Sequence, residues 1–267
     1  MSTRIAILGG GVMGETLLSA LLSAGHAPAD LVVAEKSAER AEQLRRQHRV
    51  EVVDLAPAVD GADVVLVVVK PQDVAGVLAE IAPSVGPDAV VVSLAAGVRS
   101  AVLESALPEG TAVVRAMPNT PALVGEGMFG ISPGSHCGAD ELVLVQRLLE
   151  TGGVVAVVDE SAQDAVTAVS GSGPAYVFYL AEAMIAGGVA AGLDEATARA
   201  ATVQTLRGAA ALLASTDDPP AELRARVTSP NGTTHAAITT FDAHGVRAGL
   251  EAGVRAAAAR SAELSDG

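Results

Sequence analysis

The chain has 267 residues, of which half are hydrophobic and only 2% aromatic, and its formal net charge is −14 at pH 7. This length and apolar content predict one large or two ordinary folded domains and exclude a disordered or low-complexity chain. The acidic balance argues against a nucleic-acid-binding surface, which needs a basic field, but it leaves room for small anions at helix N-termini.

Short apolar runs alternate with helical patterns along residues 1–160. The segments Met13–Ala24, Ala38–Gln47 and Glu141–Leu149 have helical spacing. The alternation predicts a parallel, doubly wound sheet of the Rossmann type. The predicted strands are Ile5–Leu8, Leu31–Ala34, Val50–Val53, Val64–Val69, Ala89–Leu94, Ala112–Ala116, Met128–Ile131 and Val154–Val158.

Strand-like runs cease after about Glu160. The remaining segments are rich in alanine and have helical spacing: Ala165–Val169, Ala175–Ala191, Glu195–Ala214 and Gly245–Leu264. The sequence therefore predicts an α/β domain over residues 1–160 and an all-helical domain over residues 161–267. Because the helical half has few large side chains, we expect it to complete its core against a second subunit.

A glycine-rich loop follows the first predicted strand and opens a helix. Its residues Gly9, Gly10, Gly11, Val12, Met13 and Gly14 have the spacing G-x-G-x-x-G, and the acidic Glu35 ends the second strand. In this context the pattern predicts a dinucleotide site, with the pyrophosphate at the helix N-terminus. The alternative is a purely structural glycine turn.

The residues after the second strand bear on which dinucleotide binds. Glu35 could hold the ribose diol of NAD, whereas Lys36, Ser37 and Arg40 could hold the 2′-phosphate of NADP. We expect NADPH to be preferred and NADH to be accepted. Alternatively, Lys36 and Arg40 are a solvated helix start.

Three further loops follow predicted strands and are expected at the same edge of the sheet, where ligands of open α/β sheets bind. We predict that these loops complete the cofactor site. Their candidate residues are Val69, Lys70 and Pro71, then Ala95, Ala96 and Gly97, and finally Asn119 within "RAMPNTPA".

Five motifs occur in a fixed order: "GGGVMG", "VKPQ", "RAMPNTPA", "DAVTAVSGSGPAYVF" and "VTSPNGTT". In this combination the chain resembles the Δ1-pyrroline-5-carboxylate reductases over its whole length. The resemblance implies an N-terminal Rossmann domain, a C-terminal helical dimerisation domain, and NAD(P)H as hydride donor to a cyclic imino acid, giving proline. It also implies a homodimer and leaves open a ring of dimers.

The same resemblance assigns the substrate site. Ser170, Gly171 and Ser172 are expected to line the pocket where the domains meet, and Gly232, Thr233 and Thr234 are expected to bind the carboxylate. Thr234 is the hydroxyl expected nearest the imine nitrogen, as an orienting or proton-relaying catalytic group. From the residues alone, an ordinary Ser/Thr helix cap is the favoured interpretation of "SPNGTT". Family members usually have glycine where this chain has Asn231, a residue that tolerates a left-handed backbone.

Other readings remain open at this point. A 3-hydroxyacid dehydrogenase relative would use a lysine of the second domain, but this chain has lysine only at positions 36 and 70. A cofactor-binding regulatory protein is the non-enzyme alternative. His235 is a less favoured acid, and the scattered histidines predict no metal site.

Location and partners follow from simple counts. The single cysteine, Cys137, cannot form an internal disulfide, so we expect a reducing, cytoplasmic location. Because no apolar run approaches the roughly 20 residues of a spanning helix, we expect no membrane partner.

Overall fold

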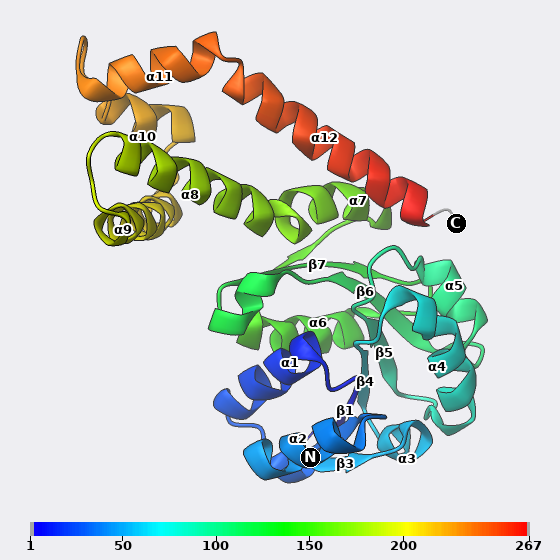
Figure 1. Cartoon of the computed structure of the whole chain (residues 1–267). Helices are drawn as coiled ribbons and strands as arrows, with labels where there is room; N and C mark the ends of the chain where they lie inside the picture. Colours follow the sequence, from blue (N-terminus) through cyan, green and yellow to red (C-terminus); the bar gives the residue numbers. More distant parts are fainter. Residues whose placement is uncertain (1–2, 266–267) are drawn as a thin grey trace. The chain divides into compact units, whose positions relative to one another are not determined.

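The computed structural model describes residues 3–265. Within them the chain divides into two compact units (Figure 1). The first unit runs to Ser172 and includes the chain from Ala257 onward, and the second unit is Gly173–Ala256. The fold class is as predicted: an α/β unit of the Rossmann type and an all-helical unit.

One eight-stranded sheet forms the centre of the first unit, in the order β3-β2-β1-β4-β5-β6-β7-β8. All neighbouring pairs from β3 to β6 are parallel. The order reverses direction between β1 and β4, which is the crevice where such sheets bind ligands. The strands are β1 Ile5–Leu8, β2 Leu31–Ala34, β3 Glu51–Val53, β4 Val64–Val67, β5 Val90–Ser93, β6 Ala112–Met117, β7 Gly127–Pro133 and β8 Gly153–Val157.

The strand β7 departs from the expected parallel arrangement. It runs antiparallel to β6 and parallel to β8. The connection from β6 to β7 holds only the short 3-10 turn Thr120–Val124, whereas a parallel return needs a crossover of about a dozen residues or more. The motif "RAMPNTPA" therefore forms a tight reversal at the carboxyl end of β6.

Helices cover both faces of the sheet (Figure 1). One apolar cluster joins α1, α2 and α6 to one face, and a second joins α3, α4 and α5 to the other. Because alternate strand residues point to opposite faces, the apolar runs are buried on both sides. These helices are α1 Val12–Ser23, α2 Ala38–His48, α3 Leu55–Val59, α4 Val74–Ile81, α5 Ser100–Ser105 and α6 Ala139–Leu149.

The segment that links the two units is helical but irregular. The short helix α7, Gln163–Val166, continues into a π-helical turn at Thr167–Gly171. Both lie in the first unit, although they follow the division expected at residue 160. A π-helical turn holds an extra residue per turn and often marks a functional site.

The second unit consists of helices with few buried side chains. In it, α8 and α11 bury no residue completely, and α9 buries only Ala198 and Thr202 within the described chain. Large apolar side chains such as Phe178 and Tyr179 are 63% and 74% exposed. The remaining helices are α8 Gly173–Ala190, α9 Glu195–Ala214, α10 Pro220–Arg226, α11 Thr233–Ala243 and α12 Val246–Ser265, of which α12 extends into the first unit.

Candidate active site

The glycine-rich loop has the geometry that a pyrophosphate cradle requires. Gly9 has φ +110°, and a Cβ there would lie 2.8 Å from the Val68 carbonyl oxygen of the β4 loop. A Cβ on Gly14 would collide with the Gly9 carbonyl oxygen. Gly11 begins α1 with no side-chain cap, and a Cβ there would meet only open space. The first N–H groups of α1 therefore have no side-chain acceptor and can bind an anion.

Glu35, at the end of β2, is tied to this loop. Its Oε2 accepts a hydrogen bond from Gly10 N–H at 3.0 Å, and its Oε1 accepts one from Ser37 N–H at 2.8 Å. The Ser37 hydroxyl caps α2. A hollow of about 520 Å³, lined in part by Glu35, Lys36 and Asp54, lies beside this turn. The exposed Lys36 can therefore reach an anion there.

Arg40 is bonded to other groups of the protein. Its Nε donates to the Gly10 carbonyl oxygen at 2.7 Å, and its Nη2 pairs with Glu15 at 2.5 Å. His48 Nε2 contacts the other Glu15 oxygen at 2.9 Å. Hydrogen bonds from His48 and Arg40 lower the pKa of Glu15. This network joins α1, α2 and the glycine-rich loop, and it gives Arg40 a structural contact in place of the proposed 2′-phosphate contact.

The next two predicted loops follow β4 and β5 at the same sheet edge. Lys70 and Pro71 are exposed, and Val69 is half-buried. After β5, Ala95 is buried, whereas Ala96 is exposed. Gly97 has φ +76°, and a Cβ there would lie 3.4 Å from the Leu264 carbonyl oxygen at the end of α12. The structure thus brings these loops to the carboxyl edge beside the glycine-rich loop.

Asn119 lies in the reversal after β6 and contacts the π-helical turn. Its Nδ2 donates to the Ser170 carbonyl oxygen at 3.0 Å, and its Oδ1 accepts from Met128 N–H at 2.9 Å. Gly171 packs against Met117, since a Cβ on Gly171 would lie 2.6 Å from Met117 Cε. The predicted residues Ser170, Gly171 and Ser172 are therefore held against the "RAMPNTPA" motif.

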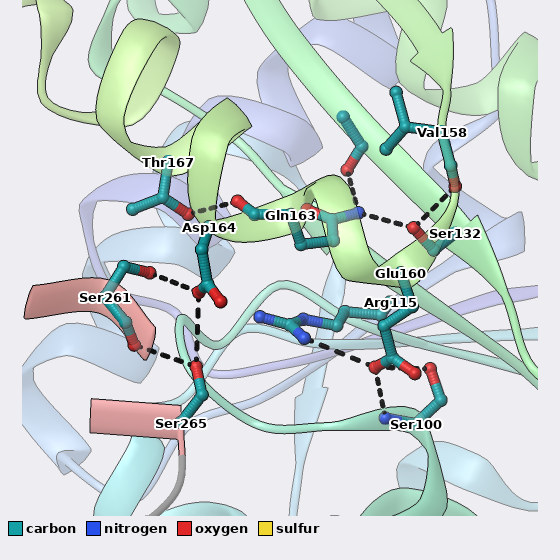
Figure 2. A network of polar contacts seen from close by, with 11 residues as sticks. Ser100, Arg115, Ser132, Val158, Glu160, Gln163, Asp164, Thr167, Ser261 and Ser265 are labelled. Carbon is teal, nitrogen blue, oxygen red and sulfur yellow. Dashed lines mark hydrogen bonds and ion pairs between the residues drawn. The ribbon is translucent and has the colours of Figure 1, made fainter. Parts of the chain in front are cut away.

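A polar network that the sequence interpretation missed anchors the same segment (Figure 2). Glu160 Oε1 accepts from Ser100 N–H at 2.7 Å and from Arg115 Nη1 at 3.2 Å. Burial alone would raise the pKa of Glu160, but hydrogen bonds from Ser100 and Arg115 hold it below its usual range. Arg115 is 5% exposed, and an arginine inside an apolar strand was the one available signal that an acidic partner exists.

The chain beyond Glu160 is fixed by two further groups in this view. The Gln163 amide donates to the Gly130 carbonyl and to the Ser132 hydroxyl, on β7. Asp164 Oδ1 accepts from the Ser261 hydroxyl at 2.6 Å, which ties the end of α12 to α7 (Figure 2). The start of the π-helical turn is thus anchored to the sheet and to the last helix.

The loop "SPNGTT" lies in the second unit, before α11. Asn231 has φ +59°, the left-handed conformation that the sequence predicts it can tolerate. Gly232 is the N-cap residue that precedes α11 and makes no side-chain capping bond. A Cβ on Gly232 would lie 2.5 Å from Ser229 Oγ. The ordinary Ser/Thr cap is therefore not what the structure shows, and the first N–H groups of α11 have no side-chain cap.

The predicted site residues thus form two groups, one in each unit. The first unit brings together the cofactor candidates and Ser170–Ser172. The second unit presents Gly232, Thr233 and Thr234 at one helix N-terminus, with Thr234 half-buried and His235 exposed. Across residues 3–265 we find no cluster of acidic, histidine or cysteine side chains arranged for a metal, and no helix long and apolar enough to cross a membrane.

Comparison with known proteins gives matches to both parts of the chain. The family model described as pyrroline-5-carboxylate reductase dimerisation matches residues 160–264, and the model described as NADP oxidoreductase coenzyme F420-dependent matches residues 4–97. A pyrroline-5-carboxylate reductase of Corynebacterium melassecola is 44% identical over 98% of both chains.

Solved structures give the same result. The chain matches a pyrroline-5-carboxylate reductase from Coxiella burnetii with a TM-score of 0.94 and 32% identity, over 99% of each chain. A Plasmodium falciparum pyrroline carboxylate reductase, solved with NADP bound, shares the fold with a TM-score of 0.88 at 24% identity over 98% of each chain. The sequence motifs, the geometry and these full-length matches lead to one conclusion: the chain belongs to the pyrroline-5-carboxylate reductase family.

Proposed function

We propose that the protein reduces Δ1-pyrroline-5-carboxylate to L-proline with NADPH, the last step of proline biosynthesis. The observation that carries the proposal is the presence, in one chain, of two separate anion cradles with uncapped helix N-termini. The cradle at Gly11 suits a pyrophosphate, and the cradle at Gly232 suits a small carboxylate. Full-length similarity to reductases of this name supports the same assignment.

The first unit would hold the dinucleotide. Its pyrophosphate would lie over Gly9–Met13 at the start of α1. The loops after β4 and β5 would line the rest of the cofactor through the predicted residues Val69, Lys70, Pro71, Ala95, Ala96 and Gly97. When bound, NADPH supplies the hydride for the imine carbon, and the role of the protein is to hold the two rings in contact.

Contacts with the adenosine end of the cofactor decide between NADPH and NADH. Lys36 and Ser37 lie at the start of α2, where a 2′-phosphate gains from the helix dipole and a cation. Glu35 is turned toward Gly10 and Ser37 and is held there by two hydrogen bonds. We therefore expect NADPH to bind more tightly and NADH to be used as well.

The second group of residues would bind the imino acid. The Gly232 N–H already donates to the Ser229 carbonyl oxygen at 3.1 Å, so Gly232 would let the backbone approach closely while the N–H groups of Thr233 and Thr234 donate to the carboxylate. The Thr234 hydroxyl can hydrogen-bond the ring nitrogen. A neutral hydroxyl is a poor acid in water, so Thr234 would orient the imine and relay a proton from solvent. Ser170, Gly171 and Ser172, in the first unit, are the other residues that we propose for binding the substrate.

The assembly is proposed to be a homodimer formed through the helical unit. The exposed apolar side chains of α8 and the match to a dimerisation family model support self-association. A ring of dimers is the larger assembly that is compatible with this surface. The single cysteine fits a reducing compartment, and we place the reaction in the cytoplasm.

The decisive experiment is to add Δ1-pyrroline-5-carboxylate to the purified protein with NADPH or NADH and to follow the nicotinamide absorbance. We expect substrate-dependent oxidation, proline as the product, and a faster rate with NADPH. Folded protein that binds NADPH but gives no oxidation would reject this substrate and favour a regulatory role.

A further inference from the structure

The side chain of Asn119 bridges two segments that are distant in sequence. One end of its amide accepts from Met128 N–H on β7, and the other end donates to the Ser170 carbonyl in the π-helical turn. An amide that makes both bonds is fixed in orientation. Asn119 therefore has a defined structural partner on each side within the first unit.

The sequence explains why the Ser170 carbonyl needs this donor. In an α-helix that carbonyl would accept from the N–H of the residue four positions later, which is Pro174. Proline has no N–H, and its ring clashes with that same carbonyl. The chain responds with a π-helical turn in which Ser172 N–H donates to the Thr167 carbonyl at 2.8 Å. Asn119 supplies the donor that Pro174 lacks.

Packing holds the next residue, Gly171, in place as well. A Cβ on Gly171 would lie 2.6 Å from Met117 Cε, so the turn rests directly on the end of β6. The Ser170 hydroxyl is itself bonded to the Val166 carbonyl at 2.9 Å. The conformation of Ser170–Ser172 thus depends on Met117 and Asn119.

We propose that Asn119 is a positioning residue, which holds the Ser170–Ser172 turn in the shape that binds the imino acid, rather than a direct ligand of the cofactor. The proposal rests on the proposed function, because it assigns that turn to the substrate. It replaces the expectation, drawn from the place of Asn119 in a loop at the edge of the sheet, that this residue contacts the dinucleotide.

The test uses Asn119→Asp and Asn119→Ala in the full-length protein. Aspartate keeps the acceptor for Met128 N–H but cannot donate to the Ser170 carbonyl at neutral pH. We expect kcat/KM for the imino acid to fall at least about tenfold in both variants, which is the effect of one lost hydrogen bond to a constrained carbonyl. The Kd for NADPH, measured without substrate, should stay within about twofold, the limit of a non-contact effect. A rise in the NADPH Kd that matches the fall in kcat/KM would overturn the proposal.

A rescue experiment provides a second, independent readout. Pro174→Ala restores the backbone N–H from which the Ser170 carbonyl would accept in an α-helix. We expect the Asn119→Ala/Pro174→Ala variant to recover part of the kcat/KM that Asn119→Ala loses, and Pro174→Ala alone to have a smaller effect. Strictly additive losses in the double variant would contradict the proposed link.

Hydrogen exchange tests the positioning role of Asn119 independently of the proposed reductase activity. Without cofactor or substrate, Asn119→Ala should speed amide exchange in the peptide Thr167–Ser172 and leave β1 and β4 unchanged. Unchanged exchange in that peptide would overturn the positioning role even if the enzyme is active. Absent wild-type turnover would refute the function and leave this measurement valid.

Discussion

The two units of the molecule differ in how completely they bury their large apolar side chains. The α/β unit buries both faces of its sheet, and twelve of its largest apolar side chains, including Phe129 and Leu66, are less than 2% exposed. The helical unit leaves Phe178, Tyr179 and Leu250 at 63%, 74% and 55% exposure. A fold of alternating strands and helices encloses its own core, whereas these helices need further surface to cover them.

The two units also differ in the binding site that each is proposed to contain. The α/β unit contains the glycine-rich loop that we propose binds the cofactor, and its geometry is set by close backbone contacts within one chain. The helical unit contains the loop before α11 that we propose binds the carboxylate. Substitutions in the first unit should therefore change cofactor binding or stability within each chain. Substitutions on the surface of the helical unit should change the self-association of the chains.

The largest effect is expected from charges placed on the exposed apolar surface of α8. Burying a Phe or Tyr contributes about 1.5–3 kcal/mol, and burying an unpaired charge costs more, so Phe178→Glu with Tyr179→Glu should weaken self-association by about 1000-fold or more. Sedimentation velocity over a range of concentrations measures this directly. Glu182→Gln on the same helix is the control and should keep the wild-type mass. A double variant with unchanged mass would show that α8 does not form the interface.

The next largest effect is expected in the cofactor cradle. Gly9→Ala places a Cβ 2.8 Å from the Val68 carbonyl oxygen at φ +110°, so the loop must move, and the NADPH Kd should rise about 100-fold, a loss of about 3 kcal/mol. Fluorescence titration checks it. Gly76→Ala, a helical glycine with nothing near its Cβ position, is the matched control and should leave binding unaltered. Sedimentation of Gly9→Ala should be normal, since the defect lies within one chain.

A smaller effect concerns the stability of the α/β unit. Glu160→Gln removes the partner of the buried Arg115. Because Glu160 is 35% exposed, we expect a loss of about 2 kcal/mol of unfolding free energy at pH 7, less than the ~3–5 kcal/mol of a fully buried pair. Urea unfolding of wild type and variant measures the difference.

The pH dependence of that difference has a definite sign. The pKa of folded Glu160 is lowered from 4.5, so its contribution is complete above about pH 4.5 and is lost as the pH falls through the lowered value. The wild type and Glu160→Gln should therefore converge in stability only in that acidic range. Convergence already at neutral pH would show that the ion pair contributes nothing.

The smallest effect is expected at Asn231. Its φ of +59° suits glycine and asparagine alike, so Asn231→Gly should change stability by less than about 0.5 kcal/mol and leave KM for the imino acid unaltered. Asn231→Val, a β-branched residue in the same conformation, should lose about 1–3 kcal/mol. Thermal unfolding of both variants tests this, and equal losses would mean that the backbone conformation does not matter.

Much of the fold could be predicted because local signals agreed with tertiary structure. The apolar runs at Ile5–Leu8 and Val64–Val67 are buried strands, and the glycine-rich loop opens α1 as its spacing indicates. The reversal of β7 was not predicted, since apolar spacing gives a strand but not its direction. The short connection after Met117 was the available signal.

The site was only partly predictable for a related reason. Family motifs pointed to Asn119 and to Ser170–Ser172 separately, but no local pattern could show that the two segments are bonded to each other. The contacts of Glu160 and of Arg40 also join residues far apart in sequence. Such pairs are a product of tertiary packing, whereas Gly11 and Gly232 belong to short motifs that can be recognised in the local sequence.

The most direct test of the division between the units is the kinetics of Thr234→Val, with Thr239→Val on the same helix as control. Valine keeps the shape and removes the hydroxyl. We predict that kcat/KM for Δ1-pyrroline-5-carboxylate falls about 10- to 100-fold, the effect of one hydrogen bond to a charged group, while the NADPH Kd is unchanged. Full activity with an unchanged KM in Thr234→Val would contradict the assignment of the imino acid to the helical unit.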